Sequence, residues 1–163
     1  MDFDLRGNLA QSIELTFQEF KEAFVTNWAA EDTTRASIFN VFETYIADFQ
    51  ALITPDFITW VDGSFVSNKK SNPNDIDFVS FVDSKIYDDK TDLVNKRFGK
   101  FGVKEFYGKY LDAYICPVYP ENHQKAFYTK SDTMDWLHQF SHTKPKKVGD
   151  KSFSKGFITI KFQ

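Results

Sequence analysis

Residues 57–82 read FITWVDGSFVSNKKSNPNDIDFVSFV, and this stretch decides the fold of the chain. Residues 57–61 and 75–82 are rich in β-branched and aromatic side chains, the composition typical of strands. Residues 67–74, which lie between them, consist of Ser, Asn, Lys and Pro, and these residue types favour a loop. We therefore predict two strands joined by a turn and a long loop, in a hairpin-like unit.

The residues before this unit predict helices. Residues 13–15 are extended, and the sequence TFQE at residues 16–19 has the capping-box form that begins a helix, which we expect to end near residue 25. A second helix is predicted from near Asp32 or Thr33 to near Thr54, where the following proline disfavours a helical conformation. Its buried face is indicated by apolar residues spaced three and four apart: Ile38, Val41, Phe42, Tyr45, Phe49 and Leu52.

The residues after the unit predict a mixture of helices and strands. We expect short helices at 91–98 and 104–107, a strand at 111–115 closed by Pro117, a helix at 133–141 and a last strand at 156–162. Helices that come first and strands that follow favour the α+β class. The predicted architecture is a single domain, residues 1–163, with a mixed β-sheet flanked by helices and the N-terminal helices preceding the sheet.

Composition excludes several classes of protein. The formal charge of −3 argues against a protein that coats nucleic acid or an anionic membrane, although a local basic patch remains compatible with it. The single cysteine, Cys116, cannot form an internal disulfide. No stretch approaches the roughly 20 apolar residues of a membrane span, and the N-terminus lacks a signal-peptide pattern. We expect a cytoplasmic protein without a membrane partner, and its 19 Phe residues predict a Phe-rich core.

Asp75 and Asp77 are the first candidate site residues. On a strand, residues i and i+2 point to the same face, so these two carboxylates project together while Ile76 turns to the core. Like charges this close repel each other, and a divalent cation compensates them. Ligands that are all oxygen suit Mg²⁺ or Mn²⁺, and Mg²⁺ completes its shell with water and substrate phosphates.

Gly63, Ser64 and Lys69 supply the nucleotide-binding part of the expected site. Glycine allows a phosphate to approach the backbone, serine adds a hydroxyl donor, and Lys69 or Lys70 would neutralise phosphate charge. Two-metal transfer requires a third acid, and Asp112 is the best candidate because it begins a later apolar strand. Glu105 and Asp92 are weaker candidates because they fall in predicted helices. These groups together indicate phosphoryl or nucleotidyl transfer.

Gly63-Ser64, the spacer and Asp75-Ile76-Asp77 resemble the motif of the polymerase-β-like nucleotidyltransferase superfamily. Together with Arg35 in the second helix and Lys155-Gly156-Phe157-Ile158 near the end, they are similar to a group of small, largely uncharacterised bacterial and phage proteins of that fold. The resemblance implies that Asp75 and Asp77 bind metal, that Asp112 is the third acid, and that Ser64 and Lys69 contact an NTP. It also implies transfer of an NMP to a protein or nucleic-acid acceptor, in a toxin–antitoxin or phage-defence setting.

Two alternatives stay open beside this prediction. The chain lacks the helical domain with which larger members of the superfamily grip their acceptor, so a catalytically inactive module that binds a nucleotide or a partner protein is the rival. A nuclease or phosphatase with an Asp-x-Asp metal site is disfavoured by the Gly-Ser element. The oligomeric state is not predicted.

Several other signals favour ordinary structural roles. His138 and His142 have the spacing of a zinc pair but no evident third ligand. Cys116 fits a small core residue. The basic run at residues 144–147 is typical of a solvated loop, with contact to a nucleic-acid acceptor as the alternative. Tyr107 or Tyr110 could stack on a base.

Overall fold

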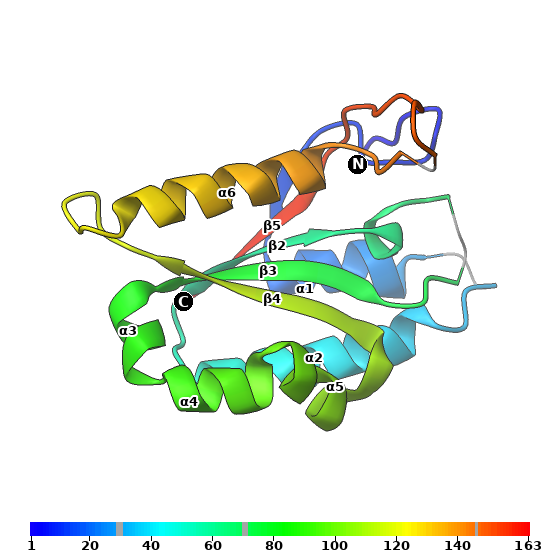
Figure 1. Cartoon of the computed structure of the whole chain (residues 1–163). Coiled ribbons are helices and arrows are strands. Elements are labelled where there is room, and N and C mark those ends of the chain that lie inside the picture. Colours follow the sequence, from blue (N-terminus) through cyan, green and yellow to red (C-terminus); the bar gives the residue numbers. More distant parts are fainter. Residues whose placement is uncertain (29–30, 70–71, 146) are drawn as a thin grey trace.

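A computed structural model describes residues 1–28, 31–69, 72–145 and 147–163, and its centre is one five-stranded sheet (Figure 1). The strands are β1 (Ile13–Leu15), β2 (Phe57–Asp62), β3 (Ile76–Asp83), β4 (Leu111–Val118) and β5 (Ile158–Phe162), in the order β1-β5-β2-β3-β4. Strand β2 is antiparallel to both β5 and β3, whereas β1 pairs with β5 and β3 with β4 in parallel. The α+β class, the mixed sheet and the hairpin of β2 with β3 are therefore confirmed.

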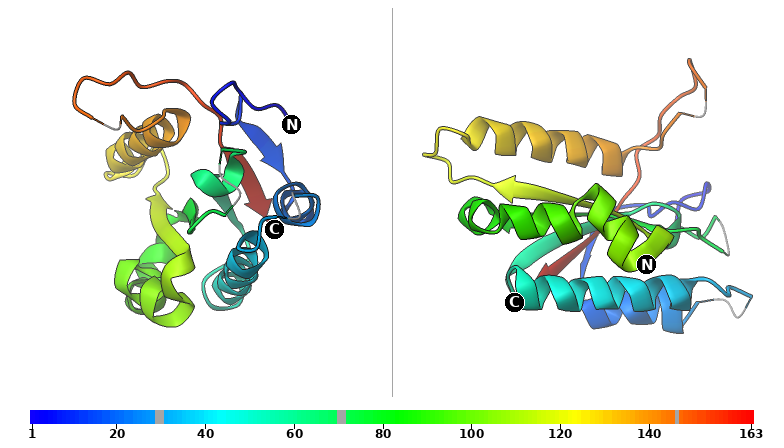
Figure 2. Two further views of the ribbon diagram at one scale, coloured as in Figure 1. Left: turned by 90° about the vertical axis from the view of Figure 1, so that its right-hand side faces the viewer. Right: turned by 60° about the horizontal axis from the view of Figure 1, so that its bottom comes forward.

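Helices cover both faces of this sheet. One face carries α6 (Ala126–Ser141), and the opposite face carries the remaining helices (Figures 1 and 2). These are α1 (Phe17–Lys21) with a π-helical turn (Glu22–Thr26), α2 (Arg35–Leu52), α3 (Ser84–Asp89), α4 (Thr91–Leu93) with a π-helical turn (Val94–Phe98), and α5 (Lys100–Tyr107). Short 3₁₀ turns at Ser64–Val66 and Gly108–Tyr110 lead into or out of strands. The chain is thus built in three layers.

The main core lies between the sheet and α1, α2 and α5, and phenylalanine dominates it. The predicted buried stripe of α2 is confirmed at Ile38, Phe42, Tyr45 and Phe49, which are all fully buried. Its last member, Leu52, is 38% exposed instead, because it lies at the end of the helix. The capping box is also confirmed, since the Thr16 and Glu19 side chains each bond the other's backbone amide.

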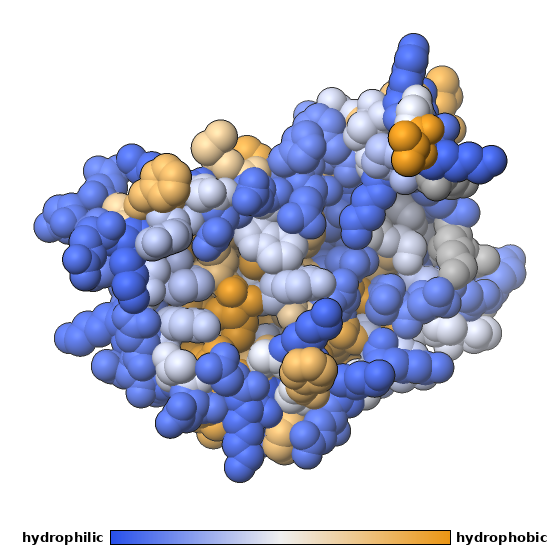
Figure 3. Space-filling model, in the orientation of Figure 1, coloured by the Kyte–Doolittle hydropathy of each residue, from blue (hydrophilic) through white to orange (hydrophobic). Residues whose placement is uncertain are grey.

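A smaller core lies between α6 and the other face of the sheet. It consists of Val79 of β3, Cys116 of β4, Phe140 of α6 and Phe157, and Trp60 and Trp136 pack against it. Figure 3 shows that hydrophobic residues gather in the middle of one side of the molecule, where β4 forms the edge of the sheet. Among the described helices, none combines the length and the apolar character needed to cross a membrane.

The structure differs from the predicted elements at β4, α6 and α3. Strand β4 continues through Pro117 to Val118, because β4 is an edge strand, where a residue without an N–H is tolerated. Helix α6 begins at Ala126 rather than near residue 133, and its first turns lacked a signal because Phe127 faces solvent with 73% exposure. Helix α3 was not predicted, although the Asp83 side chain caps it by accepting bonds from two backbone amides.

Candidate active site

Three aspartates form a row across the sheet, one on each of three adjacent strands. Asp62 of β2 is the register partner of Asp77 of β3, and Asp77 is the register partner of Asp112 of β4. Adjacent strands lie about 4.7–4.9 Å apart and register partners share a face. Val79, two residues after Asp77, packs in the α6-side core, so the row lies on the face that α6 covers.

The structure thus brings the predicted residues Asp77 and Asp112 together. Asp75 lies one residue before β3, and its negative charge helps to raise the pKa of Asp77, so it belongs to the same neighbourhood. Asp62 was not predicted as a site residue. It directly precedes Gly63-Ser64, and the alternation of β2 places it on the same face as Trp60.

The Asp77 carboxyl is in an environment that disfavours its charge. Its pKa is raised from 3.8 to about 7, most of all by burial and further by the negative charges of Asp75, Asp62 and Asp112, while Lys144 opposes the shift. Burial and like charges both disfavour the ionised form. A cation bound beside Asp77 would reverse this balance, so the electrostatics of the row favour a cation ligand.

Asp62 has a cation of its own. Both of its carboxylate oxygens accept hydrogen bonds from the Lys155 ammonium group, and the two side chains are only 10% and 12% exposed. Burial raises the pKa of Asp62, and the charge of Lys155 lowers it in opposition. Lys155 therefore ties the segment before β5 to the end of β2 beside the row.

Gly63 makes the close approach of Asp77 possible. Its backbone, at φ 85° and ψ −164°, adopts a conformation that is essentially restricted to glycine. A Cβ atom at this position would lie 1.9 Å from Asp77 Oδ2. The sequence suggests that the glycine admits a phosphate, whereas the structure shows that it admits the Asp77 carboxylate. Ser64 follows and begins the 3₁₀ turn.

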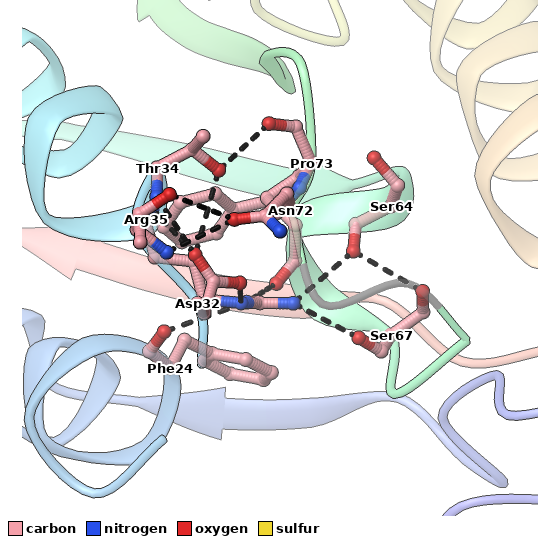
Figure 4. A network of polar contacts seen from close by, with 10 residues as sticks. Phe24, Asp32, Thr34, Arg35, Ser64, Ser67, Asn72 and Pro73 are labelled. Carbon is pink, nitrogen blue, oxygen red and sulfur yellow. Dashed lines mark hydrogen bonds and ion pairs between the residues drawn. The ribbon is translucent and has the colours of Figure 1, made fainter. Parts of the chain in front are cut away.

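Arg35 holds this turn from the other side of the sheet (Figure 4). Arg35 is 1% exposed. Its guanidinium pairs with Asp32 at 2.8 Å and donates to the backbone carbonyls of Phe65 and, at 3.1 Å, Ser67. A buried charge is stable only when it is paired and hydrogen-bonded, as here. The buried ion pair thus fixes the backbone that carries Ser64.

The start of α2 also holds the far end of the same loop. Asp32 lies two residues before the N-cap, Thr34, and its carboxylate accepts hydrogen bonds from the backbone amides of Thr34 and Arg35. The Thr34 hydroxyl donates to the Pro73 carbonyl at 3.0 Å, and the Thr33 amide donates to Asn72 Oδ1 at 2.9 Å (Figure 4). One helix N-terminus therefore positions both Ser64 and the residues that lead into Asp75.

A cavity of about 390 Å³ opens beside the row. Its lining includes Asp62, Ser64, Lys69, Asp77, Lys144 and Lys155. The predicted Lys69 therefore lies at the cavity, where its ammonium group also donates to Asn8 Oδ1. A volume of several hundred cubic ångströms is typical of small-molecule sites. A lining that contains both carboxylates and lysines suits a metal-bound polyphosphate.

The donor set fits a magnesium ion that shares its shell with a substrate. Within the described residues, no three His, Cys, Asp or Glu side chains are arranged to hold a metal ion by themselves. Mg²⁺ does not need such a cage, because it is usually held by one or two carboxylates together with water and substrate phosphates. Asp77 and Asp112, adjacent and both oxygen donors, would provide the protein's share.

Other sequence candidates do not lie at the row. Asp92 and Glu105, the weaker candidates for the third acid, are on α4 and α5, which cover the opposite face. Tyr107 packs in the core on that face, and its hydroxyl donates to Asp48, so base stacking by Tyr107 was a wrong prediction. Tyr110 also packs against that core. Lys70 lies outside the described residues.

Three further sequence signals can also be placed. The ring centroids of His138, on α6, and His142, directly after α6, lie 4.6 Å apart, and His142 lines the cavity. Cys116 is buried in the α6-side core, where burial raises the pKa of its thiol to about 11, as fits a core residue. Lys144 of the basic run lies at the cavity instead of in an isolated surface loop.

Two residues beside the row, Asp62 and Lys155, were not predicted as site residues. Asp62 could have been found from the alternation of β2. Lys155 belongs to the stretch that carries the resemblance, but its pairing with Asp62 could not have been found, because the two residues lie 93 positions apart and the contact has no local signature.

Comparison with known proteins gives a family without an assigned activity. No curated protein sequence and no solved structure matches the chain. A family model matches residues 1–161, which is nearly the whole chain. The chain therefore belongs to DUF6932, a family of unknown function.

Proposed function

We propose that this protein is a Mg²⁺-dependent nucleotidyltransferase that moves an NMP from an NTP to an acceptor hydroxyl. The observation that carries the proposal is the row of Asp62, Asp77 and Asp112 on three adjacent strands, with Gly63-Ser64 at the end of the first. The resemblance of these residues to the polymerase-β-like motif supports it. The proposed compartment is the cytoplasm.

In the proposed reaction the acceptor oxygen forms a bond to the α-phosphorus, the bond between that phosphorus and the bridging oxygen breaks, and pyrophosphate leaves. Asp112 takes the proton of the acceptor hydroxyl. Ser64 and Lys69 orient the triphosphate, and Lys144 and Lys155 add positive charge at the same cavity. Asp77, with Asp75 and Asp112 beside it, would hold the metal ion, which supplies charge stabilisation at the phosphates when it is bound.

A second candidate is a catalytically inactive module that binds a nucleotide or a partner protein. One observation favours it: the Lys155 ammonium group already contacts both oxygens of Asp62, so a lysine neutralises one of the three acids. In a toxin–antitoxin or phage-defence pair, such a module would offer the cavity to its partner.

Thermal unfolding with each of four NTPs, with and without Mg²⁺, tests the proposal. A ligand at 100 times its Kd stabilises the folded state by about 2.7 kcal/mol. We expect a Mg²⁺-dependent shift that is lost in Asp77→Asn and in Asp112→Asn. The matched control is Asp89→Asn, which makes the same chemical change at an exposed position on α3.

Transfer is then measured with a radiolabelled α-phosphate and cell extract as the source of acceptor. A Mg²⁺-dependent shift together with labelled product supports the enzyme. A shift without transfer by the extract favours the inactive module. A full shift retained in folded Asp77→Asn contradicts the site.

A further inference from the structure

A second cavity, of about 670 Å³, adjoins the one beside the acid row. The two share Lys69, Thr143 and Lys144 as lining residues, so they form one continuous depression. The second cavity is built from the N-terminal residues and the segment after α6, which lie side by side (Figures 1 and 2). Whatever binds there has direct access to the row.

This second cavity is strongly basic in a protein whose net charge is −3. Arg6, Lys69, Lys144 and Lys151 line it, against one acid, Asp150. Within the described part of the chain, Arg6, Lys144 and Lys151 form no ion pair within 4.0 Å. Asp150 instead accepts a hydrogen bond from the Lys147 backbone amide at 2.9 Å. The lining therefore favours an anionic ligand.

An aromatic ring lies among these cations. The Arg6 guanidinium lies 3.7 Å from the centroid of the Phe153 ring, and Phe153 is 37% exposed. Positive charges that follow a backbone, together with an aromatic or guanidinium plane on which a base can stack, are the two elements by which proteins bind single-stranded nucleic acid. An acidic peptide would use the charges but not the ring.

We propose that the acceptor is the end of a single-stranded nucleic acid, whose last phosphodiesters bind Arg6 and Lys151 and whose terminal hydroxyl reaches the row past Lys69 and Lys144, which line both cavities. This inference rests on the proposed function and names its acceptor. These cations reach only a few phosphates, so binding is weak and its salt slope is modest, at about 0.7 per phosphate contact. A bound base stacks beside Phe153.

The test is fluorescence anisotropy with a labelled single-stranded oligoribonucleotide of mixed sequence, at several salt concentrations. The variant is Arg6→Gln/Lys151→Gln, which leaves the cavity beside the row intact. For single strands, each phosphate contact contributes about 0.7 to the slope of log K against log salt concentration. The variant removes two contacts, so we expect this slope to fall by about 1.4 and the affinity to weaken about tenfold. The matched control, Lys85→Gln/Lys130→Gln, removes two exposed lysines elsewhere and should change neither.

Phe153→Ala separates nucleic acid from other polyanions. We expect it to weaken oligonucleotide binding about tenfold, the scale of one stacked base, without changing the salt slope. Binding of an oligoglutamate peptide with equal affinity, insensitive to Phe153→Ala, would overturn the proposal in favour of an acidic protein acceptor. Oligonucleotide binding unaffected by Arg6→Gln/Lys151→Gln would overturn it outright.

The same variants show which of the two proposals has failed. Arg6→Gln/Lys151→Gln should keep the full Mg²⁺–NTP thermal shift, because neither residue lines the cavity beside the row. If the wild-type protein shows the NTP-induced thermal shift but binds no oligonucleotide, the nucleic-acid acceptor is contradicted and the proposed function is not. Oligonucleotide binding without an NTP shift in any condition removes the proposed function.

Discussion

Asp77 carries its carboxyl into a partly buried position near three other carboxyls. Asp62 faces it from β2, Asp112 from β4 and Asp75 from the preceding loop, and Lys144 supplies the opposing charge. Selection for stability alone does not explain such an arrangement, because like charges and burial destabilise the folded chain. The arrangement is useful when a cation binds there.

The stability of the metal-free protein should therefore fall as the pH rises from about 4 to about 7. The pKa of Asp77 is raised from 3.8 to about 7 on folding, so the folded state holds this proton more tightly, and its stabilising effect is lost above pH 7. At 1.36 kcal/mol per pKa unit, the free energy of unfolding should decrease by at most about 4 kcal/mol over this pH range. Urea unfolding in EDTA at pH 5 and pH 8 measures the loss.

Asp77→Asn is the control for that measurement. The amide cannot ionise, so the variant should be more stable than the wild type at pH 8 and less dependent on pH between 5 and 8. Equal pH dependence in the two proteins would show that Asp77 is not the group responsible.

Tyr45 differs from Asp77, because it is a buried neutral group without a hydrogen-bond partner in the part of the chain that the structure describes. Its hydroxyl is the buried side-chain oxygen for which no hydrogen-bond partner exists among the described residues. The Tyr107 hydroxyl, in the same core, donates to Asp48 at 2.8 Å and accepts from Arg97 at 2.9 Å. We expect Tyr45→Phe to stabilise the fold by about 1 kcal/mol and Tyr107→Phe to destabilise it by about the same amount. Chemical denaturation of both variants measures these changes. Destabilisation by Tyr45→Phe would show that the Tyr45 hydroxyl has a hydrogen-bond partner.

The turn from β2 into the 3₁₀ helix depends on one glycine. Gly63→Ala introduces a Cβ into a backbone region essentially restricted to glycine and places it 1.9 Å from Asp77 Oδ2. Gly108 has nearly the same conformation, φ 77° and ψ −153°, but among the described residues no atom lies within 4 Å of the point that its Cβ would occupy. Backbone strain of this kind costs about 1–3 kcal/mol.

We expect both Gly63→Ala and Gly108→Ala to lose stability by this amount, but only Gly63→Ala to lose Mg²⁺–NTP binding as well. Thermal unfolding and the ligand-induced shift measure the two effects. Ligand binding retained in folded Gly63→Ala would show that binding does not depend on the close approach of the Asp77 carboxylate to residue 63.

Helix α2 is joined to the 64–67 turn by the buried pair of Arg35 and Asp32. Removal of one member of a buried pair costs about 3–5 kcal/mol, because the other charge is left without a partner. Arg35→Lys retains the charge but cannot donate to Asp32, Phe65 and Ser67 in the same fixed geometry. We expect Arg35→Lys to be destabilised by more than about 1 kcal/mol. Arg97→Lys is the comparison, since the pair of Arg97 with Asp48 is about 30% exposed and should contribute less than about 1 kcal/mol.

Ligand binding should connect segments that are distant in the chain. The cavity beside the row takes residues from β2, β3, α6 and the segment between α6 and β5, including Thr143 and Lys155. With Mg²⁺–NTP at 100 times its Kd, amide exchange through local opening should slow by up to about a hundredfold at residues 62–66 and 143–145. Helix α3, remote from the cavity, should not change, and hydrogen exchange with mass spectrometry compares the two. Protection of residues 62–66 alone would show that the segment after α6 takes no part in binding.

Much of this protein can be read from its sequence because the relevant signals are local. The alternation of residues 75–82 predicts that Asp75 and Asp77 lie close together, the spacing of apolar residues marks the buried side of α2, and TFQE begins α1. Those signals depend on backbone periodicity and on contacts a few residues apart. They were weakest where the chain departs from periodicity, as in the solvent-facing start of α6.

Only the folded chain shows how these parts meet. The register of β2 with β3 and of β3 with β4 adds Asp62 to the row and brings Asp112 beside Asp77. Lys155 reaches Asp62 across 93 positions, and Arg6 meets Phe153 near the other end of the chain. Strand register and such distant contacts follow from the packing of the whole core and from the compensation of buried charge, which no short stretch of sequence encodes.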